Sequence, residues 1–164
     1  GKEDTLVTIQ IDMLLAERFG MYYIDENGEK KLPYIIHRTS LGCYERTLAY
    51  LIEHYAGALP TWMAPEQVRF LPVTDRAVDY CKEQAAKLTA QGYRVTVDTR
   101  SEKIGKKIRD AQMEKIPYML VVGDRDIEAG TVSPRHRADG DLGAMTLDAF
   151  TAVLKDVVDN KLQK

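Results

Sequence analysis

Strand-like and helix-like segments alternate through the second half of the chain, and this alternation constrains the fold more than any other feature. The segments with strand or amphipathic-helix patterns are, in chain order, 67–73, 75–91, 94–98, 102–115, 117–123 and 147–159. The stretch PYMLVVG at 117–123 is almost continuously apolar, as expected where helices cover both faces of a sheet. We therefore predict an α/β fold with a mostly parallel mixed sheet and helices on both faces.

The ends of these segments carry further predictions. We expect residues 130–136 to form an antiparallel edge strand, because Pro134 has no N–H to donate within a central strand. Ser101 is expected to cap the helix that follows it, and Thr146 to cap the last helix.

The first 60 residues follow a different pattern. Strands are predicted at 5–12, 21–25 and 31–38, and Asn27-Gly28 between the last two predicts a hairpin, because both residues accept positive φ readily. A helix with one apolar stripe follows at 43–56. Three strands and one helix make a thin core, so we expect an antiparallel α+β segment that is the end of a larger domain.

Composition excludes several classes of protein. The 164 residues are 45% hydrophobic and 29% charged, which is typical of a soluble globular chain. No apolar run approaches the roughly 20 residues of a membrane-spanning helix. Cys43 and Cys81 make no disulfide framework, so a reducing, cytoplasmic setting is expected. With a net charge of −2, any contact with nucleic acid requires a local basic patch.

Such a patch lies at 94–115, which has seven basic and four acidic residues, a net charge of +3. Lys103, Lys106 and Lys107 are spaced to share one helix face. Two interpretations stay open: a solvated charged face, or a surface for a phosphate-rich partner. Gly105 favours the second, because glycine inside a helix costs ~1 kcal/mol and would let a partner approach the backbone.

The turn HRTSLGCYER, residues 37–46, carries more charge than a strand-to-helix connection needs. Arg46 gains nothing from the helix dipole at that end, so it is either simply exposed or placed to contact a flat base or a phosphate. His37 alone is no metal site, and neither His54 nor His136 stands at ligand spacing to it.

Several stretches together resemble the C-terminal part of bacterial threonyl-tRNA synthetases, a family of class II aminoacyl-tRNA synthetases. They are TIQID, IHRTSLGCYERTLAYLIEHYAG, PTWMAPEQV, EKIGKKIRDAQMEKIPYMLVVGD and DLGAM. The resemblance implies that 1–60 is the C-terminal part of the catalytic core, with the third class motif, and that 61–164 is an anticodon-binding domain.

The resemblance also implies roles in the core. Arg46 would stack on the adenine of ATP, used with Mg²⁺, and approach its phosphates. Thr8 and Gln10 would line the threonine pocket. His37 would be one of three protein ligands of a zinc ion, and the other two ligands are absent from this chain.

In the second domain, the resemblance implies that the second and third anticodon bases are read at positions that correspond to Ser101, Lys103, Arg109, Asp126 and Arg135. Two depart from the commonest form, in which asparagine stands at 101 and glutamate at 126. A bridging water could replace a direct contact from these shorter side chains.

The function implied is that of a threonine–tRNA ligase whose partners are threonine, ATP and threonine tRNA, and which is a homodimer when complete. We expect this polypeptide alone neither to form threonyl adenylate nor to hold zinc tightly. The alternative is a non-catalytic tRNA- or RNA-binding module or paralogue fragment. A prolyl or histidyl synthetase relative is a third hypothesis, but IHRTSLG fits the threonyl type better.

Overall fold

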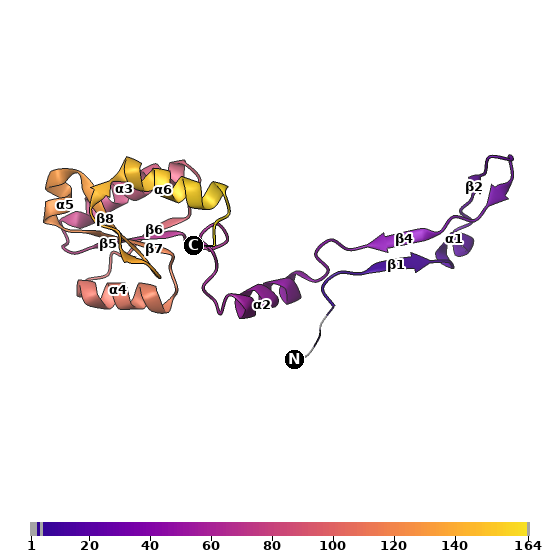
Figure 1. The fold of residues 1–164 in the computed structure, drawn as a ribbon, viewed down its shortest axis with the longest axis horizontal. Coiled ribbons are helices and arrows are strands. Elements are labelled where there is room, and N and C mark those ends of the chain that lie inside the picture. The colour runs from indigo at the N-terminus through magenta and orange to yellow at the C-terminus, as the bar shows by residue number, and fades with distance from the viewer. Residues whose placement is uncertain (1–2, 4, 164) are drawn as a thin grey trace. The chain divides into compact units, whose positions relative to one another are not determined.

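A computed structural model describes Glu3 and residues 5–163 (Figure 1). The chain divides into two compact units, Gly1–Glu53 and His54–Lys164, which are described separately below. The predicted limit between residues 60 and 61 falls inside the second unit, in the segment that precedes its first strand. Among the residues described, no helix combines the length and apolarity that a bilayer crossing requires.

The first unit contains two antiparallel strand pairs. Strand β1 (Ile9–Asp12) pairs with β4 (Ile35–Arg38), and β2 (Tyr23–Ile24) pairs with β3 (Lys30–Lys31). The hairpin predicted at Asn27-Gly28 is confirmed: Gly28 has a φ of 80°. The Asp25 side chain accepts hydrogen bonds from the N–H groups of Asn27 and Glu29, which holds the turn closed.

Two features of the first unit differ from the prediction. The strand expected at 31–38 is split between β3 and β4. A short helix, α1 (Leu15–Arg18), follows β1. It begins where it does because Asp12 Oδ1 accepts hydrogen bonds from the backbone N–H groups of Leu14 and Leu15, at 2.8 and 2.9 Å.

The first unit buries little apolar surface. Helix α2 (Tyr44–His54) has no buried residue, and its predicted apolar stripe is exposed: Leu48 and Ile52 are 54% and 47% accessible. Among the described residues up to Glu53, only Ala16 is buried.

The second unit is built on a mixed sheet with strand order β10-β8-β7-β5-β6. Its strands are β5 (Val68–Pro72), β6 (Val95–Val97), β7 (Tyr118–Val122), β8 (Thr131–His136), β9 (Gly140–Asp141) and β10 (Met145–Thr146). Strands β5, β6 and β7 run parallel, and β8 is antiparallel to β7. The predicted α/β class is confirmed.

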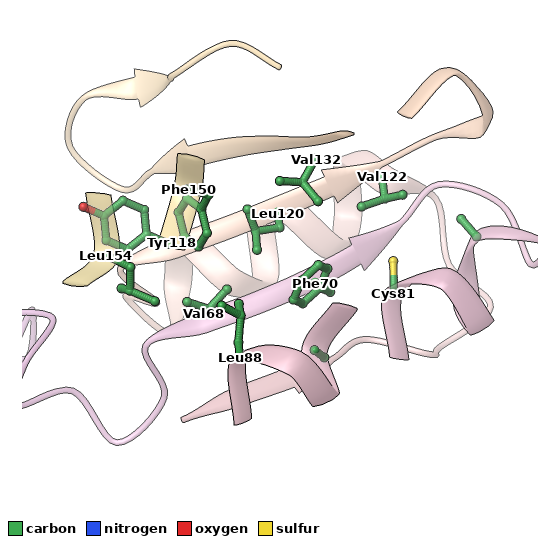
Figure 2. Close-up of a cluster of buried hydrophobic side chains, with 12 residues drawn as sticks. Val68, Phe70, Cys81, Leu88, Tyr118, Leu120, Val122, Val132, Phe150 and Leu154 are labelled. Carbon is green, nitrogen blue, oxygen red and sulfur yellow. The ribbon is translucent and has the colours of Figure 1, made fainter. Parts of the chain in front are cut away.

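Helices cover both faces of this sheet. Helices α3 (Ala77–Ala90) and α6 (Leu147–Asp159) pack on one face, α4 (Ile104–Met113) lies on the other, and α5 (Asp124–Ala129) follows β7 (Figure 1). Figure 2 shows the main core, in which Phe70, Leu120 and Leu154 belong to one buried cluster. A smaller cluster around Leu71 and Met119 packs under α4.

Strand β8 is antiparallel as predicted, but it is not an edge strand, because β9 and β10 pair along its outer side. Pro134 is tolerated because it falls between these short partners and has no ladder neighbour there. Its carbonyl oxygen still accepts a hydrogen bond from the Leu142 N–H at 2.9 Å. Charged residues on an exposed edge strand can prevent aggregation, but this does not explain Arg135, because β8 is not an edge strand.

One of the two predicted caps is confirmed. Thr146 Oγ1 accepts a hydrogen bond from the Ala149 N–H at 3.2 Å at the start of α6. The Ser101 cap is wrong: α4 begins later, with Lys103 at its N-cap and no side-chain cap hydrogen bond.

Candidate nucleic-acid interface

Most of the cations that make residues 94–115 basic are already engaged within the protein. Lys106 Nζ lies 2.5 Å from Glu102 Oε1, and the Arg100 guanidinium donates hydrogen bonds to the carboxylates of Asp98 and Asp110 at 2.7 to 2.9 Å. Hydrogen bonding to Arg100 lowers the pKa of the Asp98 carboxyl. These side chains hold the loop and the helix together before any partner arrives.

Lys107 is not part of a basic face, contrary to the prediction. Its side chain is buried, with 4% of the residue accessible. Nζ donates hydrogen bonds to the carbonyl oxygens of Pro72 and Asp98, at 3.0 and 3.2 Å. The helical phase explains this, since Lys107 falls between Ile104 and Ile108, both of which pack against the core.

Two cations of this segment remain available to a partner. Among the residues that the structure describes, Lys103 and Arg109 are the basic residues of 94–115 with no side-chain hydrogen bond or ion pair to another residue. Both are exposed. The positive surface that the sequence predicts is therefore narrower than its charge count indicates, and it depends on these two side chains.

A polar depression lies where β5 and β6 end. Its lining includes Thr74 and Asp75 after β5, and Ser101 and Lys103 after β6. The chain leaves β5 toward α3 on one face of the sheet and leaves β6 toward α4 on the other face. Crevices at the carboxyl ends of parallel strands, where the chain turns to opposite faces, are common ligand sites in α/β proteins.

Both carboxylate oxygens of Asp126 accept hydrogen bonds from other residues of the second unit. One oxygen accepts a hydrogen bond from the Gly123 N–H at 2.9 Å, and the other accepts from the hydroxyls of Ser133 and Thr131, at 2.9 and 3.3 Å. The carboxylate thus ties the start of α5 to β8. Its role as a base contact stays a prediction, and Ser133 is a neighbour that sequence reasoning missed.

Arg135 lies on the same face of β8 as Ser133, two residues further along. This is also the face of α4, because Arg135 pairs with Met119, which packs under that helix. One guanidinium nitrogen lies 3.6 Å from Asp141 Oδ2, while the buried Nε has no hydrogen-bond partner among the described residues. Arg135 therefore retains unused donor capacity on this face.

The predicted positions form two groups rather than one tight cluster. Ser101 and Lys103 share the depression, while Asp126 and Arg135 are linked through Ser133. The groups adjoin, because Thr74 in the depression donates a hydrogen bond to Asp124 Oδ1 at 3.1 Å, just ahead of Asp126. No direct hydrogen bond or ion pair joins the two groups within the described residues.

In the first unit, the structure brings together three of the predicted pocket residues. Gln10 and His37 are directly paired across β1 and β4, and Thr8 lies on the same face of the ribbon. Asp12 shares this face, with its Oδ2 3.4 Å from His37 Nε2. Hydrogen bonds from the Leu15 and Leu14 N–H groups lower the pKa of the Asp12 carboxyl, and His37 adds to this effect.

Arg46 is exposed in the first turn of α2, and its Nη1 donates a hydrogen bond to the Thr5 carbonyl oxygen at 2.9 Å. Gly42 in the preceding turn has a φ of 67°, and a Cβ there would lie 2.0 Å from the Leu6 carbonyl oxygen. Glycine is therefore required for this turn to approach the strand. The planar face of the Arg46 guanidinium stays open to a ligand.

The described residues do not complete a zinc site. They contain no group of three or more His, Cys, Asp or Glu side chains that could hold a metal ion. Structural and catalytic zinc sites need at least three protein ligands. His37 offers one imidazole, so the residues present do not fit the implied zinc ion by themselves.

Comparison with known proteins matches a different family model to each of the two parts of the chain. Residues 67–157 match the family described as "Anticodon binding domain", and residues 1–55 match the "tRNA synthetase class II core domain (G, H, P, S and T)". The structure is similar to the RNA-binding domain of threonyl-tRNA synthetase from Cryptosporidium parvum Iowa II. The TM-score is 0.80, with 34% identity, 92% of this chain covered and 38% of that one.

Curated proteins similar in sequence to this chain are named as threonine–tRNA ligases. The chain is 61% identical over 150 residues to "Threonine--tRNA ligase" of Clostridium perfringens strain SM101, covering 92% of this chain and 23% of the relative. It is 56% identical over 161 residues to the protein of that name from Clostridium botulinum strain Eklund 17B, covering 98% and 25%. The chain thus spans about a quarter of the length of these relatives. It belongs to the anticodon-binding-domain family and corresponds to the C-terminal part of a threonyl-tRNA synthetase.

Proposed function

We propose that the second unit binds the anticodon of threonine tRNA on the face of the sheet that carries α4. The observation that carries this proposal is that two basic side chains of 94–115 are free to bind a partner. Within the described residues, Lys103 and Arg109 alone among the cations of this segment have no side-chain hydrogen bond or ion pair. Unpaired exposed cations beside a polar depression suit unstacked bases and phosphates. The match of residues 67–157 to the anticodon-binding-domain family supports the binding of an anticodon by this unit.

The complete protein, in this proposal, attaches threonine to its tRNA with ATP and Mg²⁺. ATP would supply the activation of the threonine carboxylate. Arg46 would hold the adenine through its planar guanidinium and steady the phosphate charge. Thr8 and Gln10 would line the pocket for threonine, on the ribbon face that they share with His37.

Zinc belongs to the proposal only for the complete enzyme. A metal that binds the threonine hydroxyl would separate threonine from valine, which a plain apolar pocket does poorly. His37 would supply one ligand, and residues outside this chain would supply the other two. A homodimer and a cytoplasmic setting are likewise proposed for the complete protein.

Binding of labelled threonine tRNA to the 164-residue chain, measured against non-cognate tRNAs at several salt concentrations, tests the proposal. We expect preference for threonine tRNA and a steep loss of affinity as salt rises, because released counterions drive phosphate contacts. A flat salt response, or equal binding of every tRNA, would remove the α4 face from the proposal. ATP–pyrophosphate exchange with threonine tests the core separately, and turnover by this chain alone would contradict our expectation that it is inactive.

A further inference from the structure

Residues 55–66 lie between α2 and β5 and are hereafter called the linker; they are held in the second unit by side chains from outside this range. Six of its carbonyl oxygens accept side-chain hydrogen bonds, those of Ala56, Ala58, Leu59, Thr61, Trp62 and Ala64. Thr61 is fully buried and Ala64 is 4% accessible. The linker is therefore a fixed part of the domain surface and not a loose tether.

Arg137 makes the central clamp on this linker. Its Nη2 donates hydrogen bonds to the carbonyl oxygens of Ala58 and Leu59, at 2.9 and 2.7 Å, and Nη1 donates to that of Lys115 at 3.0 Å. The fork of the guanidinium suits this task, because its donors point in fixed directions within one plane. Burial lowers the pKa of the Arg137 guanidinium, because it removes the cation from water.

The clamp includes two residues in an uncommon backbone conformation. Ala56 has a φ of 49° and Lys115 a φ of 59°, and Lys115 Nζ donates a hydrogen bond to the Ala56 carbonyl oxygen. Positive φ is uncommon for residues other than glycine and persists where the surroundings enforce it. The linker is thus held in a defined conformation that depends on its contacts with Lys115 and Arg137.

Arg137 also continues the strand that carries the candidate RNA contacts. It lies two residues after Arg135, and its backbone N–H donates a hydrogen bond to the Pro117 carbonyl oxygen at 3.0 Å. A displacement of β8 on RNA binding would therefore move the guanidinium that grips the linker. The linker begins at residue 55, directly after α2, the helix in which Arg46 stands.

A second clamp stands on a different strand. Arg94 precedes β6, which is separated from β8 in the sheet by β7 and β5. Its Nε donates to the Ala64 carbonyl oxygen at 2.8 Å, and its Nη2 to that of Trp62 at 3.0 Å. Arg94 thus provides a matched control: an arginine with the same kind of contact to the same linker, but not on the strand of the RNA surface.

We propose that Arg137 is a positioning residue that couples occupation of the α4 face by RNA to the conformation of the linker. This inference rests on the proposed function, because it requires RNA to bind beside Arg135. In this proposal Arg137 acts through the linker and not by contact with RNA, because three of its side-chain donors already bind carbonyl groups of the protein.

Trp62 provides the readout, because it is the one tryptophan of the 164 residues and lies within the linker. Its ring lies near Lys161 Nζ, 5.7 Å from ring centroid to nitrogen. The experiment follows tryptophan emission, excited at 295 nm, while the anticodon stem-loop of threonine tRNA is added to the 164-residue chain. RNA binding is measured in parallel by filter retention, and thermal unfolding confirms that each variant is folded.

We expect the wild-type emission to change along the binding curve. Arg137→Lys should still bind RNA but lose this emission change, because lysine cannot bridge the three carbonyl groups. Arg94→Lys should shift the emission of the free protein yet keep the RNA-dependent change. Amide hydrogen exchange of residues 56–64 in the wild type gives a check that needs no variant, and exchange should slow when RNA binds.

Three results would overturn the inference: RNA binding without an emission change, an undiminished change in Arg137→Lys, or exchange in the linker that ignores RNA. Each of these leaves the proposed function standing, because RNA still binds. Failure of the wild type to bind the stem-loop at all would instead overturn the proposed function, and the inference with it.

Discussion

The Lys107 ammonium lies 3.0 Å from the carbonyl oxygen of Pro72, so a charged side chain of α4 holds the end of β5 from inside the domain. A buried charge of this kind costs free energy unless its hydrogen bonds are satisfied. Here they are directed at backbone carbonyl groups at the ends of two strands, Pro72 and Asp98. The shape of the depression beside Ser101 depends on that anchor.

Replacing Lys107 by methionine should destabilise the protein by about 1–3 kcal/mol, because two buried carbonyl groups would lose their donor. Lys106→Met is the matched control on the adjacent residue, where an exposed pair with Glu102 is broken and a change below about 1 kcal/mol is expected. Urea unfolding of both variants makes the comparison. Equal losses would show that Lys107 is not a structural anchor.

Gly105→Ala should have opposite effects on stability and on RNA binding. A Cβ at Gly105 would meet no atom within 4 Å, so the folded state should gain about 0.5–1 kcal/mol from the better helix former. If RNA approaches the helix backbone there, the same methyl group should weaken binding to threonine tRNA. Thermal unfolding and filter binding on one preparation measure both effects, and unchanged affinity would place the RNA elsewhere along α4.

Acid should weaken the domain through Asp98. Hydrogen bonds from Arg100 lower the pKa of this carboxyl, so its contribution to stability is present above pH 4 and is lost as the pH falls below about 4. Asp98→Asn should remove that part of the pH dependence. Free energies of unfolding of both proteins at pH 6 and pH 3 make the comparison. Parallel losses in the two proteins would show that other carboxyl groups are responsible.

Arg109→Ala should weaken binding of threonine tRNA by about 1–3 kcal/mol, and more than that of other tRNAs, if the guanidinium contacts a base. Lys82→Ala removes the same charge from α3, on the opposite face of the sheet, and should change binding little. Filter binding gives the values. A uniform small loss for every tRNA would mean that Arg109 contacts only phosphate.

The alternation of segments made the fold of the second unit predictable, because each strand and helix buries its own apolar residues. The pairing of β8 was not predictable in the same way. Its outer partners, β9 and β10, are two residues long each and carry no pattern of their own. Proline usually indicates an edge strand, because it has no N–H to donate to a neighbouring strand. This rule fails for β8, because neither β9 nor β10 pairs with Pro134.

The sequence predicts candidate residues for the site, but it does not predict the contacts that those residues make. Burial of Lys107 follows from its position between Ile104 and Ile108, and the helical phase alone would have revealed it. The grip of Arg137 on Ala58 was beyond any sequence pattern, because the two residues stand 79 positions apart and the acceptor is a backbone carbonyl group.

If the α4 face reads unpaired anticodon bases, the dissociation constants of anticodon stem-loops should depend on which base is changed. The measurement compares anticodon stem-loops of threonine tRNA in which the first, second or third anticodon base is changed. We predict that changes at the second or third base weaken binding by about tenfold or more each, equal to about 1.4 kcal/mol, while a change at the first base has little effect. Equal affinity for all of the stem-loops would contradict the account.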